Sequence, residues 1–470
     1  MEIKKERLIE RLSHFMYRKF YNRYKYKRLI QSPFFLAIAY PIYSLFNFFY
    51  FHHVLRFYLK YIEKFSKTSQ IMILGRRDFG THLWALHYAR LWQYTHRKVN
   101  LFVFTNENAH IKRLAKYILP DVEVIYPDHF FDHLVAIIFG HQFVFKYTLL
   151  RVYAYIVTHR PDFLHVWDLA ESPYVRYNAY LDPLLLHPSA SLFNEEFIKA
   201  YKHTREQMDY RWDVFRDSFT LNYTTSISRT NPGSVLSKLK KDLNIKHAYA
   251  IVNVNTKTYP GPSARRTVNY PERYDCLIDF LIEKGYDVVI HGRKEQPNYK
   301  SRKGLFNYAA SPFCTIENDM ALYLGCDFAV TSKTGAELFT TLSDVPALGL
   351  NYMELLSMQP SKKMRFYPKH LRNIATGKLF SWQELVTSPN FFDIGQNTYG
   401  TPIEYVDLEE DEMMSALQEF LPLVYLPESQ WLNYTTLQKE FKAALSPLHL
   451  DLDLTRAVPS DSYLKKTNKF

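Results

Sequence analysis

Short apolar runs alternate with amphipathic stretches along most of the chain. In the first half, runs at 71–74, 99–105, 122–126 and 163–169 have the length and composition of buried strands. A helical pattern covers 107–118, between the second and third of these runs. Strands that alternate with helices at this spacing predict a parallel sheet with right-handed crossovers.

The same alternation returns in the second half of the chain. Strands are predicted at 247–255, 286–293, 305–309 and 328–331, and a helix at 272–284 is followed by a glycine, a common helix stop. The predicted fold class is therefore α/β, with two Rossmann-like parallel-sheet domains facing a cleft.

These patterns divide the chain into four segments. They are an N-terminal basic, hydrophobic helical segment (1–67), a Rossmann-like domain with a helical connector (68–230), a second Rossmann-like domain (231–425), and a C-terminal helix and tail (426–470). The part after residue 450 is expected to be irregular. A chain of 470 residues is too long for one ordinary core, which agrees with two domains.

The positive charge of the chain is concentrated at its N-terminus. The formal net charge is +12, and residues 1–67 hold 14 Lys and Arg against 4 Asp and Glu. Almost the whole surplus therefore lies in this segment. Because a nucleic-acid-binding body would carry its basic residues over the folded domains, no nucleic-acid partner is expected.

The segment 29–55 contains no Asp, Glu, Lys or Arg. It exceeds the roughly 20 residues of a membrane span, but Pro33, Pro41, Asn47 and the many tyrosines favour an interfacial position. Flanking Lys and Arg attract anionic lipid at about 1 kcal/mol each. We therefore expect residues 1–60 to hold the protein on the cytoplasmic side of the inner membrane, as a peripheral or monotopic protein.

Two alternatives concern this N-terminal segment. Residues 33–60 would show the same apolar pattern as a helical hairpin buried against the body of the protein. A cleaved signal peptide is disfavoured, because the basic region is too long and no small-residue exit site follows.

The three cysteines (Cys276, Cys314 and Cys326) have no disulfide or zinc-site spacing, which fits a reducing cytoplasm.

The most informative motif follows the strand at 328–331. Ser332, Lys333, Thr334 and Gly335 end this strand and open a helix, so backbone N–H groups and hydroxyls there suit a pyrophosphate. The motif is not a Walker loop, because G-x-x-x-x-G-K-[ST] is absent. The alternative is that Ser332 and Thr334 only cap the helix.

Basic residues follow two neighbouring strands of the second half. Lys257, Arg265 and Arg266 lie in a long loop that starts after Asn255, and Arg293 ends the next strand. Asn255 and these basic residues are candidates for donor binding. Cations and amide donors at such a place neutralise phosphate oxygens. Each residue has the alternative of a solvated surface base, but their convergence on one sheet edge favours an anion site.

The segment 250–416 resembles a family of bacterial glycosyltransferases found among surface-polysaccharide and O-antigen genes. The resemblance is carried by IVNVN, by the loop with Arg265-Arg266 and Asn269-Tyr270, by LIDFLIEKGYDVVIHGR, and by the stretch from FNYAASPF to LGLNYMEL. LFSWQELV and QNTYGTPIEYVDLEEDEM resemble the closing helices of that family. In the first half the agreement is mainly the turn GRRDFGTHLWAL.

The resemblance implies a GT-B fold, a nucleotide-sugar donor bound by the second domain, and no obligatory metal. It also implies donor-side roles for Arg265, Arg293, Ser332, Thr334 and Gly335, with Glu337 at the ribose. Two departures from the family pattern are NVNTK at the end of the first strand, and Lys333 and Glu337 in place of small polar residues.

An inverting transferase needs a general base near the acceptor hydroxyl. The candidates in the first half are Asp78, His82, Asp168 and Glu171, and the sequence does not rank them. Asp78 has the alternative of a helix cap, and His82 that of a packed core residue. No D-x-D pair ends a strand, so no metal is expected, and no cofactor besides the nucleotide sugar as co-substrate.

The expected function is transfer of a sugar from a nucleotide-sugar donor to a growing surface glycan or a lipid-linked acceptor at the membrane face. One alternative is a nucleotide-sugar epimerase or hydrolase on the same fold, which needs no membrane segment. The other is a non-catalytic membrane-associated scaffold that has lost its donor.

Overall fold

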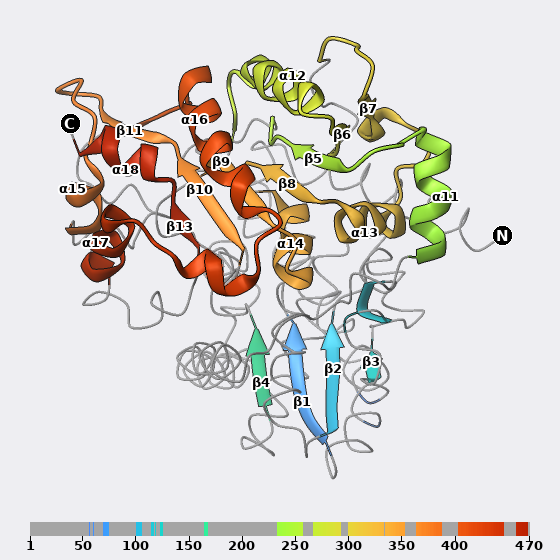
Figure 1. The fold of residues 1–470 in the computed structure, drawn as a ribbon. Coiled ribbons are helices and arrows are strands. Elements are labelled where there is room, and N and C mark those ends of the chain that lie inside the picture. The colour runs from blue at the N-terminus through green and yellow to red at the C-terminus, as the bar shows by residue number, and fades with distance from the viewer. Residues whose placement is uncertain are drawn as a thin grey trace, which may run out of the picture. The chain divides into compact units, whose positions relative to one another are not determined.

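The chain forms two compact units, Met1–Val214 and Phe215–Phe470. The computed structural model describes most of the second unit and, in the first, four strands and six helical residues (Figure 1). The described ranges of the second unit are 233–256, 267–292, 299–332, 334–352, 363–387, 403–445 and 457–468. The helical residues of the first are Arg56, Lys60, Leu114, Ala115, Lys116 and Ile118.

The first unit contains a four-stranded parallel sheet in the order β3-β2-β1-β4. Its strands are β1 (Ser69–Leu74), β2 (Asn100–Thr105), β3 (Glu123–Ile125) and β4 (Leu164–Trp167). All four strands predicted from apolar runs are therefore confirmed. Leu114, Ala115 and Ile118, in the helix predicted between β2 and β3, are buried.

The second unit is built on a seven-stranded sheet in the order β13-β10-β9-β8-β5-β6-β7, and every neighbouring pair is parallel. The strands are β5 (Tyr249–Asn253), β6 (Asp287–Ile290), β7 (Leu305–Asn307), β8 (Phe328–Thr331), β9 (Ala347–Tyr352), β10 (Met364–Pro368) and β13 (Val458–Pro459). Central strands buried on both faces are typical of parallel sheets, which explains why the sequence showed them as continuous apolar runs.

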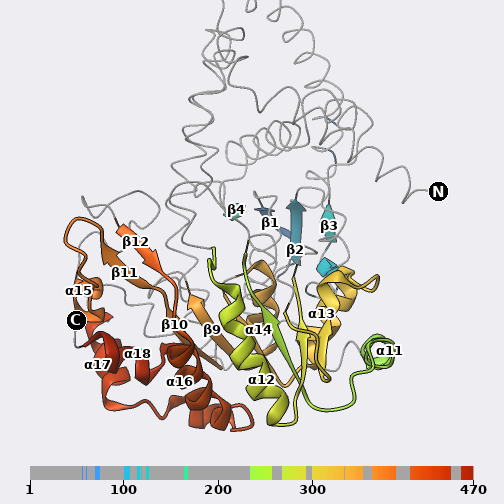
Figure 2. The ribbon, with the colours of Figure 1, turned by 90° about the horizontal axis from the view of Figure 1, so that it is seen from above.

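Helices cover both faces of this sheet (Figures 1 and 2). They are α11 (Gly233–Leu243), α12 (Asp275–Glu283), α13 (Ile316–Gly325), α14 (Leu338–Ser343), α15 (Trp382–Thr387), α16 (Glu410–Phe420), α17 (Thr436–Leu445) and α18 (Asp461–Thr467). Short 3-10 turns are η6 (Pro271–Tyr274), η7 (Tyr308–Ala310), η8 (Gly335–Glu337), η9 (Leu421–Leu423) and η10 (Glu428–Leu432). Gly285, which follows α12, has φ +88° and ends that helix as predicted.

Alternate residues of each strand belong to different faces. In β5, Ala250 and Val252 join the apolar cluster that contains side chains of α12 and α16. The intervening residues Tyr249, Ile251 and Asn253 therefore face α13 and α14, on the other side of the sheet. This alternation decides which polar side chains meet at the end of the sheet.

Two units that each contain a parallel sheet confirm the predicted α/β class with two Rossmann-like domains. None of the helices described is both long and apolar enough to cross a membrane. The N-terminal segment proposed to bind the membrane lies outside the described residues, apart from the exposed Arg56 and Lys60.

Two expectations for the C-terminal part are corrected. Ile403–Val406, expected within closing helices, is strand β12 and pairs antiparallel with β11 (His370–Asn373). Its sequence IEYV has the β-branched and aromatic residues that favour a strand. The part after residue 450, expected to be irregular, contributes β13 and α18. Pro459 lies in an edge strand of the sheet, where its missing N–H is tolerated.

A buried carboxylate attaches α18 to the rest of the unit. Glu412 of α16 accepts from Tyr367 Oη at 3.0 Å, and its Oε1 lies 2.6 Å from His370 Nε2 and 2.9 Å from Lys466 Nζ of α18. Burial alone would raise the pKa of Glu412, but His370 and Lys466 outweigh it and lower the pKa to about 2. These partners are far apart in sequence, so no local pattern predicted this contact.

Candidate functional site

Four buried polar side chains form a row across the carboxyl edge of the second sheet. Thr331 of β8 is paired with Asn253 of β5. His291 follows β6 next to Asn253, and Tyr308 follows β7 next to His291. Each is at most 3% exposed. In open parallel α/β sheets this edge is where ligands bind.

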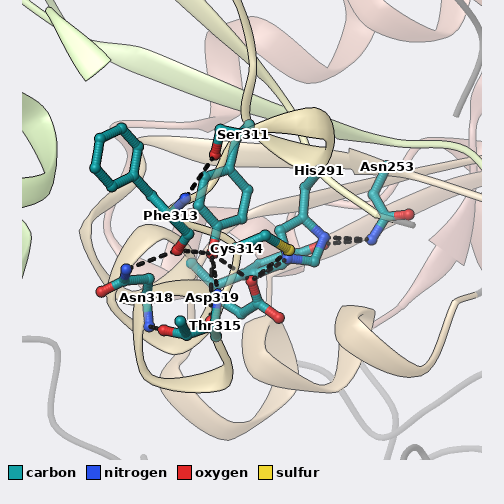
Figure 3. Close-up of polar contacts among 10 residues, drawn as sticks. Asn253, His291, Ser311, Phe313, Cys314, Thr315, Asn318 and Asp319 are labelled. Atoms are coloured by element: carbon teal, nitrogen blue, oxygen red, sulfur yellow. Dashed lines mark hydrogen bonds and ion pairs between the residues drawn. The ribbon is translucent and has the colours of Figure 1, made fainter. Parts of the chain in front are cut away.

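Asn253 and His291 are joined by a direct contact (Figure 3). Asn253 Nδ2 lies 3.0 Å from His291 Nδ1 and donates to Tyr323 Oη at 2.9 Å. The Tyr323 ring meets the His291 ring edge to face, at 5.0 Å between centroids. Because Asn253 Nδ2 is a donor, His291 Nδ1 is the acceptor in the neutral ring, and the ring proton is on Nε2.

Asp319 of α13 lies on the other side of the imidazole. Its Oδ1 is 3.3 Å from His291 Nε2 and accepts from Tyr308 Oη at 2.6 Å. The Tyr308 ring is stacked on His291, with the centroids 5.7 Å apart. Burial, followed by the Asp319 charge, raises the pKa of Tyr308, so this hydroxyl keeps its proton. Asp319 thus places a carboxylate beside His291 Nε2, although Nε2 forms no hydrogen bond within the described part of the chain.

The turn that leads into α13 is built around the Tyr308 hydroxyl (Figure 3). Thr315 N donates to Tyr308 Oη at 3.2 Å, and Thr315 Oγ1 caps α13 by accepting from Asn318 N at 3.3 Å. Asn318 Nδ2 donates to Phe313 O at 2.7 Å. These bonds hold the first turn of α13, and with it Asp319, against the end of β7.

The turn after β8 contains the predicted donor residues Ser332, Thr334 and Gly335. Ser332 Oγ accepts from Asn255 N at 2.6 Å, which ties this turn to the end of β5. The hydroxyl oxygens of Thr331 and Thr334 are buried, and neither forms a hydrogen bond within the described part of the chain. A buried hydroxyl without a partner is costly unless a ligand or water completes it.

Glu337 lies inside the second unit. The residue is only 1% exposed to solvent. Its Oε1 accepts a hydrogen bond from Tyr352 Oη at 2.6 Å. Burial, followed by the charge of Glu337, raises the pKa of Tyr352, so the tyrosine remains the donor. The ribose contact implied for Glu337 stays a prediction.

The long loop after β5 is held at both of its ends. At its start Asn255 O accepts from Val268 N at 2.8 Å. At its end, Asp407 Oδ2 accepts from Asn269 N at 2.5 Å and from Tyr270 N at 3.1 Å. We call Asn255 and 267–270 the loop stem.

A buried ion pair supports the loop stem. Lys369 Nζ, at the end of β10, contacts Asp407 Oδ1 and also donates to Thr267 O. Both side chains of the pair are 1% exposed. Burial lowers the pKa of Lys369, and the Asp407 carboxylate acts against this shift. The pair therefore places the chain directly after Arg265-Arg266 against the carboxyl edge of the sheet.

Several predicted site residues lie outside the described residues. On the donor side these are Lys257, Arg265, Arg266, Arg293 and Lys333; on the acceptor side they are Asp78, His82, Asp168 and Glu171. Residues next to the donor-side set in the chain are described. They lie at or beside the carboxyl ends of adjacent strands and are Asn255, Thr267, Gly292 and Ser332.

The polar row and the buried ion pair were not predicted from the sequence. Asn253 and His291 belong to the strand segments IVNVN and VVIHGR, whose neighbouring residues Asn255 and Arg293 were the predicted site residues. A buried-strand pattern that ends in a polar residue was the available signal. Nothing in the sequence indicated that Lys369 and Asp407 would meet.

No protein-family model and no curated protein sequence matches the chain. Among solved structures, a glycosyl transferase family 9 protein from Veillonella parvula is 10% identical and aligns over 76% of this chain and 98% of its own, with a TM-score of 0.44.

Two further structures are similar at lower scores. The E. coli heptosyltransferase WaaC with ADP is 13% identical and covers 64% of this chain and 90% of its own, with a TM-score of 0.31. A UGT transferase from Siraitia grosvenorii in complex with UDP is 10% identical, covers 59% and 80%, and has a TM-score of 0.27. All three TM-scores are below 0.5.

Proposed function

We propose that the protein is a glycosyltransferase that takes its sugar from a nucleotide-sugar donor held at the carboxyl edge of the second sheet. One observation carries the proposal. The buried Thr331 and Thr334 hydroxyls have no partner within the described residues, and they flank the Ser332–Asn255 bond that joins the β8 turn to the loop stem.

The chemistry of this edge suits a diphosphate. Two hydroxyl donors are available there. The loop stem begins directly after Arg265 and Arg266, so we expect their side chains at the same edge. Arg293 directly follows Gly292, at the end of the neighbouring β6. Hydrogen bonds from Arg to phosphate oxygens are charge-assisted and stabilise a leaving nucleoside diphosphate without a metal.

The acceptor side of the proposal rests on the sequence. The basic, aromatic N-terminus suits an anionic membrane surface, so we propose a growing glycan or lipid-linked acceptor at the cytoplasmic face of the inner membrane. Asp78, His82, Asp168 and Glu171 are the candidates for the base that removes the proton of the acceptor hydroxyl.

A panel of nucleotide sugars and nucleoside diphosphates tests the donor proposal by thermal stability. A ligand at a hundredfold excess over its dissociation constant stabilises the folded protein by about 2.7 kcal/mol. We expect a selective rise in melting temperature with one nucleotide family, which also names the donor class. If no nucleotide changes the melting temperature, the donor proposal is wrong and the scaffold alternative takes its place.

Deleting residues 1–60 tests the membrane proposal. The full chain should bind vesicles that contain an anionic lipid and release at high salt, because screening weakens surface electrostatics. The shortened chain should stay in solution while keeping the melting transition of its second unit. Vesicle binding that survives the deletion would place the membrane contact elsewhere in the chain.

A further inference from the structure

The amide of Asn253 has one end bound and one end available. Its Nδ2 serves His291 Nδ1 and Tyr323 Oη, whereas no residue in the described part of the chain donates to its Oδ1. Figure 3 shows this oxygen turned away from His291. Within the polar row, the strand on that side of Asn253 is β8, with the unpartnered Thr331 hydroxyl.

The charge state of His291 decides which end of this amide faces the imidazole. A neutral ring accepts at Nδ1, so Asn253 presents Nδ2 to it. A protonated ring donates at both nitrogens, so the amide must rotate to bring Oδ1 to Nδ1–H. Tyr323 Oη adapts to either arrangement, because a hydroxyl both donates and accepts. After the rotation, Nδ2 faces the side of Thr331 and offers N–H donors there.

The charged group that faces His291 within the described residues is a carboxylate. Asp319 of α13, 3.3 Å from Nε2, places a carboxylate against the ring. The other facing groups are neutral hydroxyls, because burial raises the pKa of both Tyr308 and Tyr323. The Cys314 thiol lies 4.0 Å from Asp319 Oδ1, and Glu337 acts on Tyr323 from η8. In the described residues, no cation faces the imidazole.

We propose that His291 is a positioning residue that couples donor binding to proton uptake. This inference rests on the proposed function. A diphosphate beside Thr331 favours the imidazolium by charge, and it favours Asn253 Nδ2 over Oδ1 as its neighbour. Both effects act in the same direction. Binding therefore takes one proton from solvent onto His291 Nδ1, the Asn253 amide turns, and its N–H groups face the diphosphate.

The sign of the pH dependence follows from linkage. A group that gains a proton on binding makes binding stronger as the pH falls. The upper limit for a single group is a change in affinity of about tenfold per pH unit. The affinity for a nucleotide sugar should thus decrease as the pH rises. The diphosphate of a nucleotide sugar does not titrate near neutrality, so the dependence belongs to the protein.

Isothermal titration in two buffers of different ionisation enthalpy tests this inference. The probes are UDP-glucose, ADP-glucose and GDP-mannose, each at one pH near neutrality. For the probe that binds, the wild-type protein should take up a measurable fraction of a proton, up to one. His291→Gln, which keeps hydrogen-bonding groups but cannot titrate, should bind without this uptake.

Asp319→Asn is the second variant, at a partly exposed position, and it carries the test if His291→Gln does not fold. Removing the carboxylate that faces Nε2 should reduce the proton uptake and flatten the pH profile of binding. A merely structural role of the network predicts the same uptake in all folded variants.

The outcomes separate the two proposals. Binding without proton uptake, or equal uptake in the wild type and the folded variants, overturns the role of His291 and leaves the donor site intact. Absence of binding by every probe and every nucleotide of the thermal panel overturns the proposed function, and this inference with it.

Discussion

Replacing Asp407 by alanine should lower the stability of the second unit by about 3–5 kcal/mol, because it leaves the Lys369 ammonium buried without its carboxylate. The backbone N–H groups of Asn269 and Tyr270 lose their acceptor in the same variant. For a unit of this size the loss corresponds to a fall in melting temperature of between about 6 and 20 °C. Differential scanning calorimetry measures it.

The control for this variant is Glu404→Ala, three residues away on β12. Glu404 forms an ion pair with Arg372 at 3.0 Å, but both side chains are well exposed, at 50% and 39%. Exposed pairs contribute about 1 kcal/mol or less. A second comparison is the double variant Lys369→Met with Asp407→Ala, which should be less destabilised than Asp407→Ala alone. Equal effects of Asp407→Ala and Glu404→Ala would show that the buried pair does not hold the loop stem.

Arg265→Ala and Arg293→Ala should each weaken donor binding by about 10- to 100-fold. This range corresponds to the loss of a charged hydrogen bond to phosphate, about 1.5–3 kcal/mol. The double variant should lose the product of the two factors if the residues act independently. Titration calorimetry with the nucleotide sugar selected by the thermal panel measures the dissociation constants.

The matched control is Arg302→Ala. Arg302 is an arginine of the same unit whose guanidinium binds Asp275 and Asp279 of α12. Its removal should leave donor affinity unchanged. The melting temperatures of Arg265→Ala and Arg293→Ala without ligand should match that of the wild type. Unchanged affinity in both of these variants would remove the basic residues from the donor site.

Much of the fold could be predicted from the sequence, because its strands are local patterns. Tyr249–Asn253, Asp287–Ile290 and Phe328–Thr331 are short apolar runs followed by polar residues, and such runs are strands in a doubly covered parallel sheet. The β8 turn and its hydroxyls were predicted for the same reason, since Ser332 to Gly335 directly follow one of these runs.

The C-terminal part was predicted less well because its elements depend on distant partners. β13 has two residues, and its strand conformation comes from pairing with Arg365 and Phe366, about ninety residues earlier. Likewise, α18 is attached through Lys466 to Glu412 of α16. Neither segment has a local signal strong enough to predict its place.

The sequence by itself determined the alternation of strands and helices, the parallel sheets, and the polar residues that end the strands, because these follow from the period and length of apolar runs. Only the tertiary structure decided that Asn253, His291 and Thr331 share one face, and that Asp319 and Asn253 lie on opposite sides of one imidazole. The physical reason is that strand register and helix packing, which bring together residues 28 to 78 positions apart, are set by the whole core.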